Sequence, residues 1–468
     1  MQLKCAKYLN EACIPFIKFY VTFSVRWVKH RPDSALNCTG VNDRPHYMTD
    51  IPLSLDKAPV TQTDTSIQVG AMEQTIPFQF TGTGTEYFKI WIVNILLSII
   101  TLGIYSAWAT VRTKRYFYGN TLFDKASFEY HATPMQILKG RIVALVLGLI
   151  VVLTTQFAPD IGSLLLVVIF LLSPWAIVSG LRFNARMSSY RNVRFDFKGK
   201  VGRAYYIMIL VPVLFALILG VIGFGVFNMT QTVPYFSTEI GKLIVGLMFV
   251  ILFIGLYLVI PYMQKLFAAF FINASLYGQG VFSTTIQSRY FYWVYIQAFL
   301  IAFLIGLVVL GIVFGFMGLT VSDFDFSSEE VVGGMLITLL MLLSVFIIPI
   351  YLLSLLVGLF LLAFVRAKIR NYTYNSTQLD TVLHFQANTS FLALWGIYLL
   401  NLLLLIVTLG LAHPWNKVRL ARYEAHTLWG EITGSLDQYV SQRQAEQSSL
   451  GDQIGDVFDL EVSSGLGL

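Results

Sequence analysis

Two matched pairs of polar side chains are the best candidates for chemistry in this sequence. Asn94 and Thr101 lie in one apolar segment, and Asn401 and Thr408 lie at equivalent positions of another. An amide in hydrocarbon costs on the order of several kcal/mol if it has no hydrogen-bond partner. The pairs could form a polar site between two broken helices, an arrangement found in transporters. They could instead hold helices together through hydrogen bonds worth about 0.6 kcal/mol on average, which is the commoner role.

Both pairs belong to a longer match between residues 94–116 and residues 401–423. The residues that return at one constant offset, without a gap, are Asn94, Thr101, Leu102, Gly103, Trp108, Val111, Arg112, Arg115 and Tyr116. Two helices rich in Leu and Ile would share apolar residues by chance. They would not also share a Gly, a Trp, an Asn and a pair of Arg in register. The match therefore predicts an internal repeat.

The same match contains a second set of residues, suited to binding at a membrane surface. Its members are Trp108, Arg112 and Arg115 in the first copy, and Trp415, Arg419 and Arg422 in the second. Arginines at this spacing can grip an anionic lipid headgroup, while a tryptophan anchors the interface between water and lipid. The alternative is that the set only anchors the chain, through the excess of positive charge that cytoplasmic segments carry.

The sequence shows no pattern typical of a catalytic or metal site. It lacks a Gly-rich phosphate loop, a His-x-x-x-His pair and a Gly-x-Ser-x-Gly elbow. Near the predicted cytoplasmic interface, where a solvated histidine is far commoner than a metal ligand, lie His131, His384, His413 and His426. The cysteines Cys5, Cys13 and Cys38 are irregularly spaced. We therefore predict no catalytic residue, no metal, no cofactor and no enzymatic activity.

Composition predicts that these residues belong to a membrane protein. Of the 468 residues, 56% are hydrophobic and 12% are charged, whereas a soluble domain has about 25% charged residues. Such a chain cannot cover its surface with polar groups in water. The net charge is +6, but the basic residues cluster beside apolar runs, which is typical of membrane topology rather than of nucleic-acid binding.

The hydrophobic pattern predicts at least six membrane-spanning helices, each of which needs about 20 apolar residues. These spans are 137–157, 162–183, 204–227, 241–266, 291–318 and 334–364. The connections 112–141, 182–203 and 366–388 carry several Lys and Arg, whereas 158–161, 228–240 and 319–333 carry acidic residues and little or no basic charge. Because short basic loops stay in the cytoplasm, we predict a multi-pass protein of a bacterial inner membrane with cytoplasmic basic loops.

Two further apolar segments, 88–110 and 389–412, leave the number of crossings open. If both crossed the membrane, the six spans between them would put their matching basic ends on opposite sides. In one interpretation each segment is a broken, re-entrant helix with both ends on one side, since Gly103 and Gly410 interrupt them and Pro414 follows. In the other, the chain has eight true spans and its C-terminus lies outside. We favour the first.

Alternating aromatic and polar residues precede most apolar segments. The pattern is clearest at Phe78-Gln-Phe80, Phe128-Glu-Tyr130 and Phe195-Asp-Phe197, with Phe282 and Phe385 as degenerate members. It predicts short β-hairpins at the cytoplasmic interface, or alternatively amphipathic loops with an aromatic belt. The predicted fold class is thus an all-α polytopic membrane protein with six to eight transmembrane helices, internal repeats and, on the first alternative, short β-hairpins.

Three regions follow from these patterns. Residues 1–75 read as a divergent, disordered N-terminal extension, rich in Thr, Asp, Pro and Gln near its end. Its apolar stretch 12–28 is too short for a span and is interrupted by Lys18 and Arg26. A secretory signal is the alternative to a plain extension, although no convincing small-residue cleavage site follows it. Residues 76–440 form the membrane region, and residues 441–468 form a disordered tail.

One family shares the most distinctive motifs of this sequence. Phe78-Gln-Phe-Thr-Gly82, Thr101-Leu-Gly-Ile-Tyr105 and Phe128-Glu-Tyr130, together with Trp108 and Arg112, resemble the YjgN family of bacterial inner-membrane proteins, which is grouped under a domain of unknown function. The similarity covers residues 76–440, and the first 70 residues depart from it. The resemblance implies an inner-membrane location, but it implies no activity and no catalytic residues.

Two functions remain in competition. The first is transport or permeation of a small solute or a lipid-like molecule. The second is a scaffold or regulatory role, in which the basic cytoplasmic face binds anionic lipids or partner proteins. A transporter requires a water-accessible path near Asn94 and Asn401, whereas two asparagines buried between dry apolar helices would remove this support.

Overall fold

The computed structural model describes residues 73–321 and 329–447, and it describes no side chains for residues 236, 237, 256 and 316–347. Nearly all of the predicted N-terminal extension, with Cys5, Cys13 and Cys38, lies outside the described residues. So do residues 448–468 of the predicted tail. Residues 322–328 of the predicted acidic connection 319–333 also fall outside this range.

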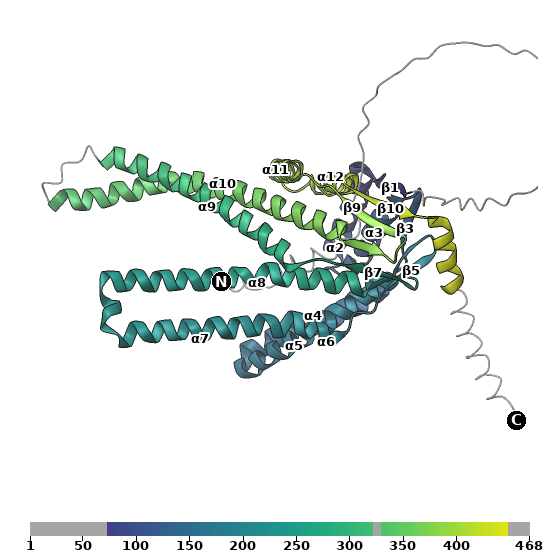
Figure 1. Ribbon diagram of the computed structural model, residues 1–468, viewed down its shortest axis with the longest axis horizontal. Helices are drawn as coiled ribbons and strands as arrows, with labels where there is room; N and C mark the ends of the chain where they lie inside the picture. The colour runs from purple at the N-terminus through teal and green to yellow at the C-terminus, as the bar shows by residue number, and fades with distance from the viewer. Residues whose placement is uncertain (1–72, 322–328, 448–468) are drawn as a thin grey trace, which may run out of the picture.

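The described chain alternates between short antiparallel strands and antiparallel pairs of helices (Figure 1). The strands are β1 (Glu73–Phe80), β2 (Thr121–Phe123), β3 (Ala126–Tyr130), β4 (Ser188–Tyr190), β5 (Val193–Phe197), β6 (Ser275–Tyr277), β7 (Gly280–Thr284), β8 (Thr377–Leu379), β9 (Leu383–Ala387) and β10 (Leu428–Thr433). The helix pairs are α2 (Gly84–Ile100) with α3 (Ser106–Gly119), α4 (Pro134–Phe157) with α5 (Pro159–Arg186), α6–α7 (Val201–Tyr205 and Val211–Thr232) with α8 (Glu239–Ala274), α9 (Ser288–Val321) with α10 (Glu329–Asn375), and α11 (Phe391–Val407) with α12 (His413–His426). A π-helical turn, η1 (Tyr206–Leu210), joins α6 to α7, and a 3₁₀ turn, η2 (Pro234–Ser237), precedes α8.

The ten strands of the described chain close into one antiparallel barrel. Strands that are consecutive in sequence pair with each other: β2–β3, β4–β5, β6–β7 and β8–β9 are hairpins, and a helix pair separates the members of each other consecutive pair. β1 also pairs with β10, so that Glu73 faces Thr433 and Pro77 faces Trp429. A closed barrel leaves no exposed strand edge. The predicted β-hairpins are therefore present, and the sequence prediction of an all-α fold needs one correction, because the hairpins join each other into a single sheet.

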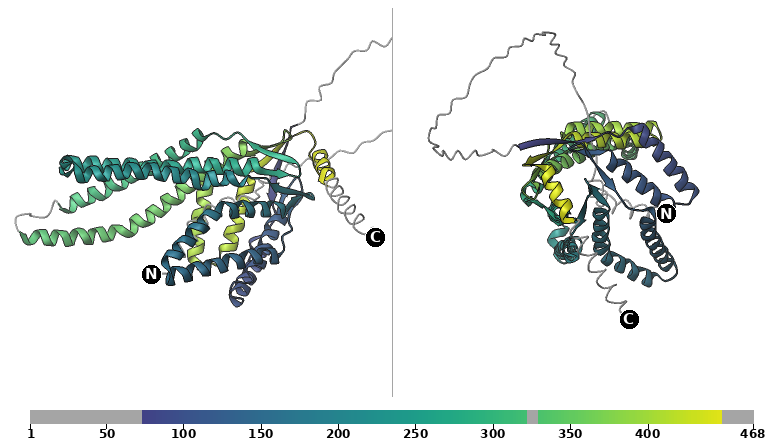
Figure 2. Two further views of the ribbon diagram at one scale, coloured as in Figure 1. Left: turned by 90° about the horizontal axis from the view of Figure 1, so that it is seen from below. Right: turned by 90° about the vertical axis from the view of Figure 1, so that its right-hand side faces the viewer.

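The long helices all project from one end of this barrel (Figures 1 and 2). Within the described residues, six helical segments are long and apolar enough to cross a membrane: Pro134–Phe157, Pro159–Arg186, Val201–Thr232, Glu239–Ala274, Ser288–Gly315 and Ile348–Asn375. Five of the six predicted spans lie within single helices, namely α4, α5, α8, α9 and α10, and the sixth, 204–227, runs through α6, η1 and α7. Every helix pair leaves the barrel and returns to it, which places all the basic ends on one side.

The two remaining apolar segments are helical hairpins rather than single spans. The predicted segment 88–110 is divided between α2 and α3, and 389–412 is divided between α11 and the turn before α12. Both ends of each hairpin lie at the barrel, as the broken-helix interpretation required. The conflict over the basic ends therefore disappears, because these segments do not change side.

The tips of the two short hairpins share one backbone conformation, which their matching sequences explain. Leu102 and Gly103 have φ of +49° and +90°, and Leu409 and Gly410 have +49° and +92°. The Thr101 hydroxyl donates to the Leu97 carbonyl at 2.7 Å and accepts from the Tyr105 amide at 2.9 Å. Thr408 makes the same bonds in the second hairpin. The threonine thus stabilises the turn, and the glycine permits its left-handed backbone.

The barrel is closed at its far end by a helix over residues 436–447. Its Leu436 and Tyr439 join the core of the barrel. Asp437 pairs with Arg191 at 2.5 Å, and Arg443 pairs with Asp380 at 3.1 Å. The barrel therefore opens only toward the helices in the described part of the chain, and the helix extends into the segment predicted to be a tail.

The fold predicts that the barrel and the chain end share one side of the membrane. A fluorescent protein fused at the C-terminus should fold and fluoresce in the cytoplasm, whereas alkaline phosphatase fused there should be inactive. The same reporters inserted after Ala158, between α4 and α5, should give the opposite pattern. An active C-terminal phosphatase would contradict this topology.

The hairpin tips predict a contrast between two glycines of one hairpin. Gly410→Ala should destabilise the protein by about 1–2 kcal/mol, because an L-residue disfavours this left-handed backbone. Gly396→Ala, in the middle of α11 with open space around it, should be neutral or stabilise by roughly 0.5–1 kcal/mol. Thermal unfolding in detergent, followed by tryptophan fluorescence, measures both. Equal effects would exclude backbone strain as the reason for Gly410.

Candidate functional site

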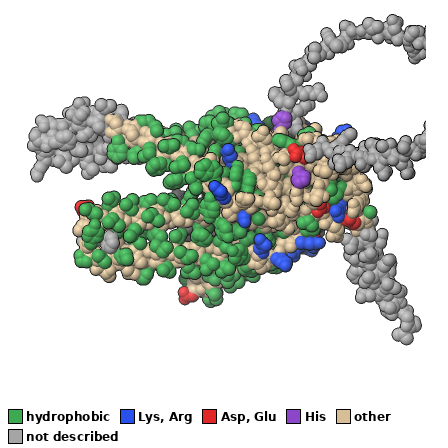
Figure 3. All heavy atoms as spheres, in the orientation of Figure 1, with side chains coloured by type: hydrophobic (Ala, Val, Ile, Leu, Met, Phe, Trp, Pro, Cys, Tyr) green, Lys and Arg blue, Asp and Glu red, His purple; other side chains and the backbone are tan. Residues whose placement is uncertain are grey.

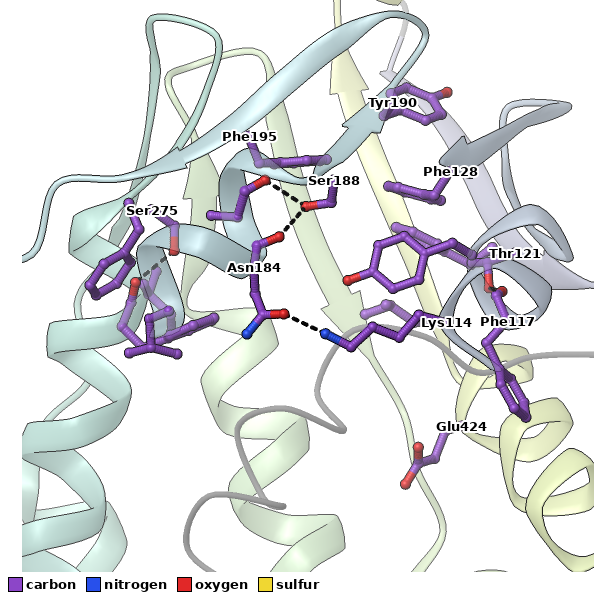
Figure 4. A pocket seen from close by; sticks show the side chains of 18 of the residues that line it. Lys114, Phe117, Thr121, Phe128, Asn184, Ser188, Tyr190, Phe195, Ser275 and Glu424 are labelled. Carbon is purple, nitrogen blue, oxygen red and sulfur yellow. Dashed lines mark hydrogen bonds between the residues drawn. The ribbon is translucent and has the colours of Figure 1, made fainter. Parts of the chain in front are cut away.

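A cavity of about 1050 Å³ lies where the barrel meets the helices. The inner face of the barrel forms one wall, and the barrel-proximal ends of the helices form the other. Its lining changes from aromatic inside the barrel to charged at the helix ends. Figure 4 shows both kinds of side chain facing the same space.

Five phenylalanines, one from each strand that leads into a described helix pair, line the barrel wall of the cavity. Ring centroids lie 6.4 Å apart between Phe78 and Phe128, 6.3 Å between Phe128 and Phe195, and 6.1 Å between Phe282 and Phe385. Phe385 in turn lies 6.4 Å from Phe78. These are the residues of the aromatic alternation in the sequence. They give the cavity an apolar end.

Hydroxyl groups form the next layer toward the helices. Thr121, Ser188, Ser275 and Thr377 each begin a strand, and each donates to the carbonyl four residues earlier, at 2.6–3.2 Å. Each of these carbonyls lies in the last turn of the preceding helix, where backbone carbonyls have no hydrogen-bond partner within the helix. This layer ends the helices without leaving unpaired carbonyls against the cavity.

Lys114 of α3 enters the cavity from one side (Figure 4). Its ammonium donates to the Asn184 Oδ1 of α5 and, at 3.2 Å, to the Tyr130 hydroxyl. Burial, together with the nearby positive charge of Arg141, lowers the pKa of Lys114 to about 8. Its hydrogen-bond partners are all neutral.

Arg141 of α4 lies over the same face of α3. Its guanidinium donates to the Ser106 hydroxyl at 2.5 Å and to the Thr110 hydroxyl at 2.7 Å. Ser106, Thr110 and Lys114 are four residues apart in turn, so they share one face of the helix. All of them line the cavity.

The opposite side of the cavity holds a cluster in which one carboxylate compensates part of the positive charge, and we call it the compensated cluster. Arg366 pairs with Glu424 at 2.6 Å, across α10 and α12. Arg370 donates to the Glu424 carbonyl, to Thr389 and, at 3.0 Å, to Thr427. Lys417 donates to the Tyr87 hydroxyl at 3.3 Å and lies over the rings of Tyr87 and Phe117.

The charges of the cavity do not balance. The cations that line it in the described chain are Lys114, Arg141, Arg366, Arg370 and Lys417, and the carboxylates are Asp196 and Glu424. Asp196 pairs with Arg186 at 2.8 Å, and that arginine does not line the cavity. The space is therefore cationic at its helical end and suits an anion with an apolar part.

The two asparagines predicted as a polar pair have separate surroundings. Asn94 is buried and lines the cavity, where its Nδ2 donates to the Ala109 carbonyl at 3.4 Å and its Oδ1 has no partner among the described residues. Asn401 accepts from Arg419 at 2.8 Å, within the α11–α12 hairpin. Only Asn94 of the two thus faces the cavity.

Two of the four predicted lipid-headgroup arginines, Arg115 and Arg422, bind backbone carbonyls. Arg115 donates to the carbonyls of Tyr130 and Ala132 at 3.2 and 3.3 Å. Arg422 donates to the Gly82 carbonyl at 2.8 Å, and Gly82 follows β1 as Ala132 follows β3. Each of these arginines therefore fixes the loop between a strand and the next helix.

The remaining predicted interface residues stabilise the short hairpins. Arg112 donates to the Tyr105 hydroxyl at 3.0 Å, and the Trp108 ring stacks on Tyr105 at 6.0 Å. Trp415 packs against Phe88 of α2 at 4.9 Å, which joins the two short hairpins. Whether any of these residues also contacts lipid stays a prediction.

Sequence reasoning missed the cations that line the cavity. It placed Lys114, Arg141, Arg366 and Arg370 in basic connections, whereas the structure turns them inward from helix ends. A signal was available in their spacing. Lys114 and Arg370 each lie seven residues before the hydroxyl that begins a strand, at Thr121 and Thr377. Among the described residues, no group of three metal-ligating side chains lies close enough to hold a metal ion.

The chain is similar to bacterial proteins of the inner membrane. The profile of a family described as a bacterial protein of unknown function (DUF898) matches residues 75–457. The inner membrane protein YjgN of Salmonella typhimurium is 27% identical over 369 residues, which are 76% of this chain and 88% of that protein. The protein of the same name from Escherichia coli O157:H7 is 34% identical over 148 residues, which are 31% of this chain and 37% of that protein. No solved structure matches the chain.

The compensated cluster predicts a large cost for removing its carboxylate. Glu424→Gln should lower the free energy of unfolding by about 3 kcal/mol, because it leaves the part-buried guanidinium of Arg366 without a counter-charge. Glu239→Gln is the matched control, since Glu239 forms an exposed pair with Lys242 at the far end of α8 and should change stability by less than about 1 kcal/mol. Thermal unfolding in one detergent compares them. Similar losses in both variants would refute a structural role for Glu424.

Proposed function

The chain belongs to the YjgN family, and on that premise we propose that it is a multi-pass inner-membrane protein that binds an anionic, lipid-like molecule in this cavity and moves it within or across the bilayer. The observation that carries the proposal is the cavity itself. It combines excess cations with an aromatic wall at the level where the helices meet the barrel. The location follows the names of the relatives, and the proposal assigns no bond-breaking step to the protein.

The cavity extends along α2, which gives an apolar chain a place to lie. Trp91, Asn94, Ile95, Ser98 and Ile99 line it at the three- and four-residue spacing of one helix face. Ile99 lies at the end of α2 and is 67% exposed. The cavity therefore reaches from the barrel to the tip of the α2–α3 hairpin, where surrounding lipid can enter.

The long helices favour a lipid-like ligand over a small water-soluble one. In the most apolar window of each described span, at most 17% of the residues are buried. Such exposed helices face lipid rather than enclosing a polar path. Within the described residues, the central parts of these helices carry no ionisable side chain, and a carrier of ions or protons would usually need one.

The distribution of charge supports a cytoplasmic barrel. Figure 3 shows Lys and Arg side chains toward the barrel half of the molecule, while hydrophobic side chains cover the outer lengths of the long helices. Short basic segments stay in the cytoplasm. The same charge would attract anionic lipid of the inner leaflet toward the cavity.

Equivalent contacts around the barrel support the internal repeat. After each strand that leads into a helix pair, the next residue donates its backbone amide across that pair. The acceptor is the carbonyl of the residue just before the following strand, at distances of 2.8–3.3 Å. These donors are Thr81, His131, Lys198, Thr285 and Asn388. We infer that segments 94–116 and 401–423 belong to two copies of a unit made of one helix pair and one β-hairpin.

The proposal predicts selective retention of anionic lipid. Protein purified in mild detergent and analysed by native mass spectrometry should bind dioleoylphosphatidylglycerol about tenfold more tightly than dioleoylphosphatidylcholine. Thr113→Trp, which fills the cavity from α3, should remove this preference. Ala144→Trp, on the exposed face of α4, should retain it.

Movement is tested separately, in vesicles that contain a fluorescent phosphatidylglycerol. The wild-type protein should expose the inner-leaflet probe to a membrane-impermeant quencher, and Thr113→Trp should not. Binding without movement would favour the scaffold role over transport. An absence of binding, or equal binding by both tryptophan variants, would refute the cavity as a lipid site.

A further inference from the structure

Lys114 and Arg141 form a pair of neighbouring cations without a carboxylate. They come from α3 and α4, and Arg141 lies close enough to lower the pKa of Lys114. Neither forms an ion pair in the described part of the chain, where the partners of both are amide or hydroxyl groups. By contrast, Arg366 of the same cavity has Glu424. This corner of the cavity therefore has a local charge of +2 when both groups are protonated.

The five equivalent helix ends show that this pair departs from the repeated pattern. The position seven residues before the first residue of the following strand is occupied by Lys114, Leu181, Ala268, Arg370 and Ala421 in turn. Arg370 is held by Thr389, Thr427 and a backbone carbonyl within the compensated cluster. Arg370 also lies within the electrostatic influence of the Glu424 carboxylate, whereas the described partners of Lys114 are an amide and a hydroxyl and its charged neighbour is Arg141.

The remaining N–H donors of Lys114 and Arg141 suit one kind of ligand. Lys114 has three N–H donors and Arg141 has five, and each uses two of them within the described residues. The Ser106 hydroxyl lies beside Arg141, whereas the Thr110 hydroxyl already donates to the Ser106 carbonyl at 2.9 Å. A planar guanidinium beside an ammonium suits the oxygens of a phosphate group. A phosphomonoester carries a charge of about −1.5 to −2 at neutral pH, which matches this pair better than the single charge of a diester.

We propose that Lys114 and Arg141, with the hydroxyl of Ser106, bind the phosphate of a phosphomonoester that carries a long apolar chain. The inference rests on the proposed function and names the ligand class of the same cavity. The phosphate lies between α3 and α4, and the chain follows the α2 face through Trp91, Ile95 and Ile99 toward the lipid. A partner carboxylate is missing because the ligand supplies the negative charge.

The test uses the full-length protein in detergent and measures lipid affinity by native mass spectrometry. The probes are dioleoylphosphatidic acid, a monoester, and dioleoylphosphatidylglycerol, a diester. The wild-type protein should prefer phosphatidic acid by about tenfold. Lys114→Met and Arg141→Met should each weaken binding of phosphatidic acid by about tenfold and lose most of this preference. Arg141→Lys should restore part of the affinity, because it returns the charge without the fork of donors.

Lys139→Met is the matched control. Lys139 lies two residues from Arg141 on the same helix but is exposed and does not line the cavity, so its removal should leave the affinity unchanged. Folding is checked by thermal unfolding. Lys114→Met should not lower the melting temperature, because it relieves repulsion between neighbouring cations.

Competition with inorganic phosphate shows whether the subsite recognises free phosphate or only the phosphate of a lipid. If millimolar phosphate displaces phosphatidic acid from the wild-type protein, the subsite recognises the anion by itself. If it does not, the subsite requires the attached chain, and either result is consistent with the pair as the phosphate ligand. Unchanged binding of phosphatidic acid by both Met variants would overturn the subsite while leaving the cavity as a lipid site. A wild-type protein that binds neither lipid would refute the proposed function itself.

Discussion

Closure of the barrel by the β1–β10 pair is the constraint on which the rest of the structure depends. Strands of three to eight residues are too short to be stable as isolated hairpins. Each hairpin is stabilised because its neighbours satisfy the backbone groups on both edges, and closure removes the last free edge. Because every helix pair begins and ends in this ring, closure also fixes where the helices enter the membrane. The cavity is the space that the ring encloses at their bases.

The helix pairs of this ring are unequal in length, and under the proposed function that inequality lets lipid reach the cavity. A helix of 17 residues, such as α2 or α11, is about 25 Å long, and one of 14 residues, such as α3 or α12, is about 21 Å long. Neither reaches across a hydrocarbon core of about 30 Å. The two short pairs are neighbours, joined by the contact of Trp415 with Phe88. Under the proposed function their tips, where Leu102 and Leu409 are each 94% exposed, end within the bilayer beside the cavity.

Much of this architecture could be predicted from the sequence because it depends on local patterns. The six spans follow from runs of apolar residues, and the tips of the short hairpins follow from Thr-Leu-Gly, since only that order supplies both a hydroxyl for the turn and a left-handed glycine. The aromatic alternation around Phe78, Phe128 and Phe195 marked the strands. Barrel closure could not be predicted in this way, because it pairs Glu73 with Thr433, and no local pattern specifies such a distant partner.

The candidate site was harder to predict for a related reason. Positive residues beside a span usually anchor it at the cytoplasmic surface. This rule does not distinguish Arg115 and Arg422, which bind backbone carbonyls, from Lys114 and Arg141, which line the cavity. What separates them is the face of the helix on which each side chain lies, and that face is set by the strand that follows. Asn94 and Asn401 occupy matching sequence positions, yet only the first faces the cavity, because Arg419 takes the second as its partner.

The contrast between the two sides of the cavity gives the strongest argument that it binds something. A charge removed from water is destabilising unless a counter-charge and hydrogen bonds compensate it. Arg366 meets this requirement through Glu424, whereas Lys114 and Arg141 have neutral partners and repel each other. Native structures are consistent at most positions and depart from consistency mainly at functional sites. Among the described residues, the repulsion between Lys114 and Arg141 is best explained by an anion that the protein binds from its surroundings.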